Sequence, residues 1–84
     1  MIHLALDGKV VAVPRDVVHA IAVAAAARAG LSGRHRDLSL KLHRALEAGH
    51  ASLGQGDVRA LVAVLEETHP DLGPGAAELL SAVA

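Results

Sequence analysis

Apolar residues alternate with polar or small ones in two short runs at the start of the chain, and Asp7 and Gly8 separate the runs. Such alternation is typical of strands that expose one face. An Asp-Gly pair between β-prone runs favours a hairpin, because a type I′ turn needs positive φ at both central residues. We predict strands over about 2–6 and 9–13. A two-stranded hairpin is marginal alone, so we expect it to pack on helices and to leave its outer edges free for another chain.

The next apolar segment, over about 15–29, has almost no polar face. Pro14 suits the first turn of a helix, and Gly30 is placed to end it. A helix that is apolar on several sides has to be covered on several sides, by this chain or by a second copy. Another backbone can come close to the small side chains along it, and we predict an oligomer interface formed by Ala20, Ala24 and Ala27.

A second helix is predicted over about 35–48, with Ser32 or Asp37 capping its start. Its apolar residues recur at helical spacing and define an inner face made of Leu38, Leu42, Ala45 and Leu46. Leu40 lies off this stripe, so we expect it to contact the hairpin or a partner. Residues 49–54 are predicted to form an irregular connection.

Two further helices are predicted in the C-terminal half, over about 55–68 and 76–83. The first of them follows Gly54, and Asp57 stands three residues on, as in a capping box. Pro70 is expected to end this helix, because proline lacks the N–H group and crowds the preceding turn.

Length and composition favour one small domain, residues 1–84, that is stabilised by association. At this length a folded chain hides only about 60–65% of the surface that its unfolded form exposes. Apolar residues make up 52% of the chain but include no aromatic residue, so the core buries little area per side chain and is thin. The predicted fold is α+β and mostly α, with a β-hairpin over about 2–13 followed by three to four short helices. We expect a homo-oligomer, most simply a dimer.

The absence of cysteine excludes disulfides and thiolate zinc sites. The longest unbroken apolar run covers residues 20–27 and is far shorter than the roughly 20 residues that span a bilayer. The apolar start is interrupted at Asp7, too early for a signal-peptide core. We therefore predict a cytoplasmic protein that does not enter a membrane.

No set of residues in the sequence has the spacing of a known catalytic or metal site. The six histidines include no pair at the i, i+4 spacing of a helical zinc site, so we expect scattered surface histidines, no metal and no cofactor. Ser39 and His43 are one helical turn apart, the spacing that places a nucleophile and its base side by side on a helix, but no oxyanion hole can be argued around them. We predict that the protein is not an enzyme.

Charge is distributed unevenly along the chain. Between residues 28 and 44 five cations stand against one Asp, a net charge of +4, whereas the remainder carries −5, which gives −1 in all. A basic stretch of this kind can bind an acidic protein or nucleic acid, and its candidate contact residues are Arg28, Arg34, Arg36, Lys41 and Arg44. The alternative is that these cations lie on solvated faces that attract the acidic part, within one chain or between chains.

The string AARAGLS, at residues 26–32, resembles the centre of a helix-turn-helix DNA-binding motif. In that motif an Ala stands four positions before the turn Gly, as Ala26 does before Gly30, and Leu-Ser opens the recognition helix. The resemblance implies that Arg34, His35 and Arg36 face the groove. The chain departs from the motif at Arg36, where the family has Val or Ile. A DNA-binding regulator with a degenerate helix-turn-helix around Ala26–Leu38 is therefore the alternative function.

Two longer stretches, LDGKVVAVPRDVV and HRALEAGHASLGQGDVRALVAVLEE, are similar in composition to small accessory proteins of actinobacteria and their bacteriophages. The resemblance covers most of the chain, contains no diagnostic motif and assigns no site residues. It implies a protein that binds a partner and does not transform a substrate. Together with the thin core and the free hairpin edges, it predicts a non-enzymatic interaction or regulatory protein that acts through oligomerisation and protein–protein contacts.

Overall fold

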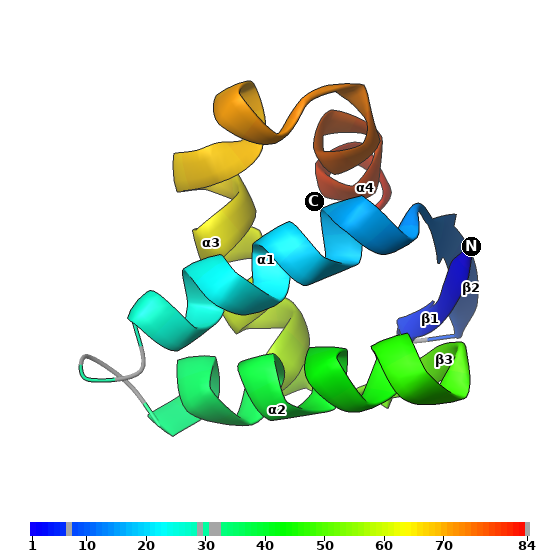
Figure 1. The fold of residues 1–84 in the computed structure, drawn as a ribbon, viewed down its shortest axis with the longest axis horizontal. Helices are drawn as coiled ribbons and strands as arrows, with labels where there is room; N and C mark the ends of the chain where they lie inside the picture. Colours follow the sequence, from blue (N-terminus) through cyan, green and yellow to red (C-terminus); the bar gives the residue numbers. More distant parts are fainter. Residues whose placement is uncertain (7, 29, 31–32, 84) are drawn as a thin grey trace.

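A small sheet and four helices make up the part of the chain that the structure describes (Figure 1). This part of the computed structural model comprises residues 1–6, 8–28, 30 and 33–83, with residues 69 and 70 described by their backbone alone. In chain order the elements are β1 (Ile2–Leu6), β2 (Lys9–Val13), α1 (Arg15–Ala27), α2 (Gly33–Ala48), β3 (His50–Leu53), α3 (Gln55–Leu72) and α4 (Pro74–Val83). The predicted α+β class with mostly helical content is confirmed, and both hairpin strands have their predicted bounds.

A third strand is the main difference from the predicted fold. β3 occupies residues expected to form an irregular connection, and it pairs parallel with β1, so that the sheet has the order β2-β1-β3. Four residues carry too little alternation to predict a strand, and the open edge of β1 supplies the hydrogen bonds that make one. Only one of the two hairpin edges is therefore left open within the described residues, and it belongs to β2.

Gly49 allows the chain to pass from α2 directly into β3. Its φ of +88° lies in the region that favours glycine. Its N–H donates to the carbonyl of Ala45 at 2.7 Å, which closes the helix, and its carbonyl accepts from the N–H of His3 at 2.9 Å, which begins the β1–β3 ladder. One residue thus ends a helix and sets the register of a parallel strand pair.

The sheet has a buried face and an open face. In β1, Ile2, Leu4 and Leu6 are buried while His3 is exposed. The buried face and the helices share one apolar cluster, whose larger members are Ile2, Leu4, Leu6, Val13, Val17, Val18, Ile21, Leu38, Leu42, Leu53, Leu61, Val64, Leu65 and Leu79. The core is therefore built from Leu, Val and Ile together with buried Ala, and helices cover the sheet on one side.

α1 and α2 lie side by side and run in opposite directions, and α3 contacts both of them (Figure 1). α4 contacts α3 and the end of β2. Gly75 marks a close approach, because a Cβ atom there would lie 2.9 Å from a methyl carbon of Val17. The predicted inner face of α2 is confirmed: Leu38, Leu42 and Ala45 are buried and Leu46 is half-buried.

Some helix ends differ from their predicted positions. α1 ends at Ala27 with Arg28 as its C-cap, so Gly30 is not its cap, and the candidate cap Ser32 lies outside the described residues. α3 continues past Pro70 to Leu72, with Gly73 as its C-cap. The half-buried Leu72 packs on the core, and this contact offsets the hydrogen bond that proline cannot donate. α4 begins at Pro74, a favoured first helical residue.

Replacing Leu42 with alanine is expected to lower the free energy of unfolding by about 2–5 kcal/mol, because the side chain is fully buried and its removal leaves a cavity. Leu40→Ala is the matched control on the same helix, since Leu40 is 49% exposed, and it should cost less than about 1 kcal/mol. Urea unfolding followed by circular dichroism measures both values. Equal losses in the two variants would contradict the assignment of the inner face of α2.

Candidate functional site

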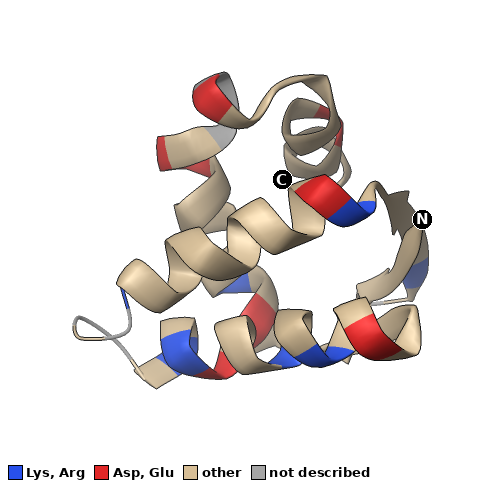
Figure 2. Cartoon of the chain, viewed as in Figure 1, with Lys and Arg blue, Asp and Glu red and all other residues tan. Residues whose placement is uncertain are grey.

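Two of the five basic residues predicted to bind a partner, Arg28 and Lys41, are paired with acidic residues of the same chain. Figure 2 shows cations mainly along α2 and acidic residues on the C-terminal part of α3 and on α4. Arg28, after α1, pairs with Glu67 of α3 through Nη2 and Oε2 at 2.8 Å, and its Nη1 donates to the carbonyl of Ala24 at 2.9 Å. Arg28 therefore joins α1 to α3 within one chain.

Lys41 is likewise engaged inside the molecule. Its ammonium group pairs with Asp57, a buried carboxylate at the start of α3. Oδ2 of Asp57 also accepts the backbone N–H of Gly54 at 3.1 Å, which confirms the predicted capping interaction. A carboxylate is favourable at a helix N-terminus, and a cation beside it compensates its burial. Lys41 thus connects α2 to the cap of α3.

The remaining predicted contact residues, Arg34, Arg36 and Arg44, are exposed on α2. Arg36 and Arg44 stand one turn on either side of Leu40, which is exposed, so the outer face of α2 is mixed in character. Leu40 is 49% exposed and does not belong to the core cluster, and its predicted contact with a partner stays a prediction.

The arrangement of α1 and α2 differs from a helix-turn-helix. In that motif the two helices meet at about 90–120°, whereas α1 and α2 lie alongside each other in opposite directions (Figure 1). Three of the expected motif residues, Ala29, Leu31 and Ser32, lie outside the described residues. The helix pair is an antiparallel helical hairpin.

Ser39 has a structural position rather than that of an accessible nucleophile. It is buried, and its hydroxyl donates to the carbonyl of Ala22 in α1 at 3.0 Å. Nδ1 of His43 lies 2.8 Å from the carbonyl oxygen of Ser39 and 3.4 Å from its hydroxyl oxygen. The Ser39 side chain therefore links α2 to α1, and its hydroxyl proton is already used in the hydrogen bond to Ala22.

The outer face of α1 is apolar and nearly uncharged. Of the predicted interface residues, Ala27 is exposed, while Ala20 and Ala24 are half-buried and Ala24 packs on the core. Val23, which the prediction missed, is 51% exposed at the centre of this face. The small-residue pattern alone did not show which turn of the helix points outward.

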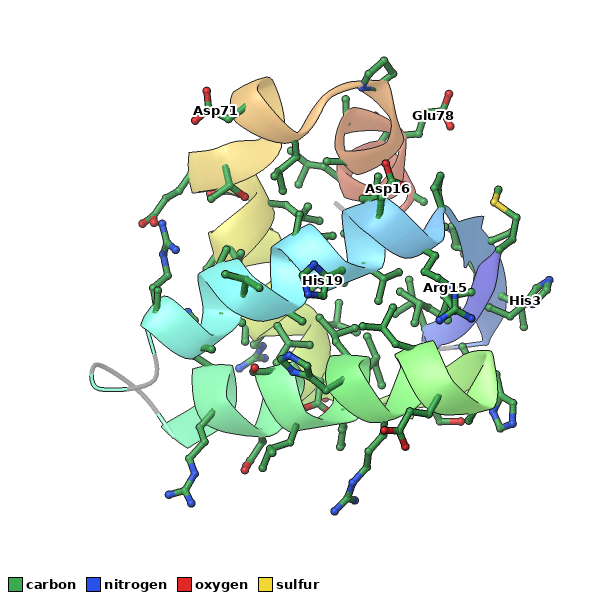
Figure 3. The ribbon with its side chains drawn as sticks, in the orientation of Figure 1. His3, Arg15, Asp16, His19, Asp71 and Glu78 are labelled. Carbon is green, nitrogen blue, oxygen red and sulfur yellow. The ribbon has the colours of Figure 1, made fainter. Side chains whose placement is uncertain are left out.

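A cavity of about 610 Å³ lies at the start of this face, lined by Arg15, Asp16, His19 and Leu46. Figure 3 shows Asp16 and His19 projecting from α1, with Arg15 reaching towards the sheet end of the molecule. Nη1 of Arg15 donates to the carbonyl of Leu46, which closes the gap between α1 and α2. The three polar side chains are all exposed, so this is a shallow surface hollow with no buried polar group.

The free edge of β2 is the surface that the backbone defines most clearly. Because the N–H of His3 points to β3, the backbone groups of Ile2, Leu4 and Leu6 point to β2. The backbone groups of their register partners in β2 point towards β1. By alternation, the N–H and C=O groups of Val10 and Ala12 point away from β1, out of the sheet edge. Val10 is 69% exposed.

This edge has few of the features that prevent strands from pairing in soluble monomers. Charged side chains, prolines and bulges usually give that protection. The register with β1 is continuous from Ile2–Val13 to Leu6–Lys9, so β2 contains no bulge. Residues 10–13 are Val, Val, Ala and Val, without charge or proline. Lys9 stands at the very start of the strand.

Comparison with known proteins adds no functional residue: no family model, no curated protein and no solved structure matches the chain. Among the described residues, His, Asp and Glu form no group of three or more that could hold a metal ion. Within the same residues, every helix is too short or too polar to cross a membrane.

Removal of the Ser39 hydroxyl is expected to destabilise the fold, because it leaves the buried Ala22 carbonyl without that donor. Ser39→Ala should lower the free energy of unfolding by about 1–3 kcal/mol. Ser52→Ala, at an exposed position in β3, is the control and should change it by less than about 0.5 kcal/mol. If chemical denaturation gives equal stabilities for Ser39→Ala and the unmodified protein, the helix–helix link is not the role of Ser39.

Proposed function

We propose that this is a non-enzymatic interaction or regulatory protein whose working unit is a homodimer joined through the β2 edges. The observation that carries the proposal is the uncharged, bulge-free outer edge of β2, with backbone groups of Val10 and Ala12 directed away from the sheet. Unpaired edge groups of this kind are a template for a further strand.

A twofold axis beside Val11 makes the two edges complementary. Val10 of one chain then faces Ala12 of the other, and each such pair exchanges two N–H···O=C bonds, about four bonds in all. The sheet continues from one chain into the next. A closed twofold contact is the commonest symmetry of soluble homo-oligomers, and it leaves no further β2 edge for aggregation.

The rest of the molecule supports association. The core contains no aromatic side chain, so additional burial between chains adds stability that the monomer lacks. The outer face of α1, with Val23 and Ala27 exposed, provides a surface for a protein partner. Aliphatic and small side chains without charge are typical of the centre of a protein interface.

Ala12→Pro is expected to convert the dimer into a folded monomer, because proline removes an N–H that points outward and is not used in the pairing with β1. Sedimentation equilibrium should give the mass of two 8.6 kDa chains for the unmodified protein and of one for the variant. Val11→Pro is the matched control: it removes an inward N–H and should lower stability as well.

Two outcomes of this experiment would contradict the β2 interface. One is an unmodified protein that stays monomeric at several hundred micromolar. The other is an Ala12→Pro variant that stays dimeric. Val23→Glu places a charge at the centre of the outer face of α1, so a dimer that this variant alone dissociates would place the interface at Ala20, Ala24 and Ala27 instead.

Duplex DNA tests the alternative function. We expect no shifted band with mixed-sequence duplex at 50 mM salt, because Arg28 and Lys41 are paired with acidic groups of the same chain. Phosphate contacts would make any complex strongly salt-dependent. A complex that dissolves at higher salt, and that weakens in an Arg36→Ala/Arg44→Ala variant, would favour the DNA-binding regulator over the protein-interaction role.

A further inference from the structure

Two histidines that are far apart in the sequence are direct neighbours on the open face of the sheet. In the parallel pairing of β1 with β3, His3 is the register partner of His50. The bond from the His3 N–H to the Gly49 carbonyl, at 2.9 Å, fixes that register. Neighbouring strands lie about 4.8 Å apart, and register partners project from the same face.

The strand residues that surround this pair on the open face have small, uncharged side chains. By the register, the row that contains both histidines continues to Ala12 of β2, and the next row contains Val10, Ala5 and Ser52. Both histidine residues are exposed, and Figure 3 shows the His3 side chain directed into solvent, away from the helices. The imidazoles are therefore free to turn towards each other, and the strand residues that the register places beside them carry no charge.

We propose that His3 and His50 form a two-imidazole binding site for a divalent late transition-metal ion. Imidazole nitrogen suits Cu²⁺, Ni²⁺ and Zn²⁺, and affinity for a given nitrogen site is highest for Cu²⁺ in this series. At metal–nitrogen distances of about 2.0–2.1 Å, two adjacent ligand nitrogens lie roughly 3 Å apart. Side chains from neighbouring strands can reach this separation, and water completes the coordination.

The site has a mechanical consequence because of the strands that it joins. A metal ion held by both imidazoles links β1 to β3. These two strands are neighbours in the sheet although the α1–α2 hairpin lies between them in the chain. The unfolded chain does not hold the two residues together, so the ion binds the native state preferentially and stabilises it. The site lies on the sheet face, and the proposed dimer contact lies on the β2 edge, so the two proposals are independent.

Calorimetric titration of the untagged, chelator-treated protein with CuCl2, NiCl2 or ZnCl2 tests the site. We expect saturable binding of one ion per chain, tightest for Cu²⁺. At a free metal concentration ten times Kd, the ratio of native to unfolded protein rises about 11-fold, or about 1.4 kcal/mol. This corresponds to a rise in Tm of roughly 5–10 °C for a domain of this size, which circular dichroism can follow.

The variants His3→Gln and His50→Gln should each lower the affinity at least tenfold and abolish the rise in Tm. His19→Gln, at an exposed position on α1, is the matched control and should retain both. The proposal is overturned if binding is not saturable or if His19→Gln loses it equally. It is also overturned if only His3→Gln has an effect, because His3 would then bind the ion without its partner strand. Circular dichroism without metal confirms that each variant is folded.

Discussion

The parallel pairing of β1 with β3 is the interaction on which the rest of the fold depends. It joins the N-terminal hairpin to a strand that follows α2, so the chain between them has to cross the sheet and return. Parallel strands need such a long connection, and helices usually supply it. Here the α1–α2 hairpin does so, and Gly49 makes the last turn because it adopts positive φ.

This constraint also determines which surfaces remain available. Since β1 is central, its backbone groups are used on both sides, and the open edge of the hairpin is the edge of β2. Because the helices cover one face of the sheet, the alternate residues of all three strands form an open face on the other side. The proposed dimer edge and the histidine pair thus follow from one topology, although they occupy different surfaces.

Two ion pairs within the chain join its basic middle to its acidic part. Arg28 of the basic middle contacts Glu67 of the acidic C-terminal half, and Lys41 contacts Asp57. Exposed ion pairs contribute little to stability, so the Arg28 contact mainly positions α1 against α3. The Lys41 contact differs in that it compensates a buried carboxylate that also caps a helix.

Local patterns in the sequence were sufficient for the hairpin, the inner face of α2 and the cap of α3. In each case neighbouring residues supply the signal: alternation around Asp7-Gly8, leucines at helical spacing, and Asp57 three residues after Gly54. The candidate contact surfaces were also partly predictable, because a two-stranded hairpin has free edges and an alanine-rich helix has to bury its apolar faces.

Tertiary structure decided the rest, because the remaining features depend on residues that are distant in the chain. β3 has weak strand character and forms because β1 offers it partners. The role of Ser39 depends on Ala22 of α1, whose carbonyl accepts the hydrogen bond of its hydroxyl group. His3 and His50 show no ligand spacing in the sequence, and only the parallel register makes them neighbours. The sequence by itself determined the hairpin and the helices, and the pairing of β1 with β3 determined the third strand and which side chains meet.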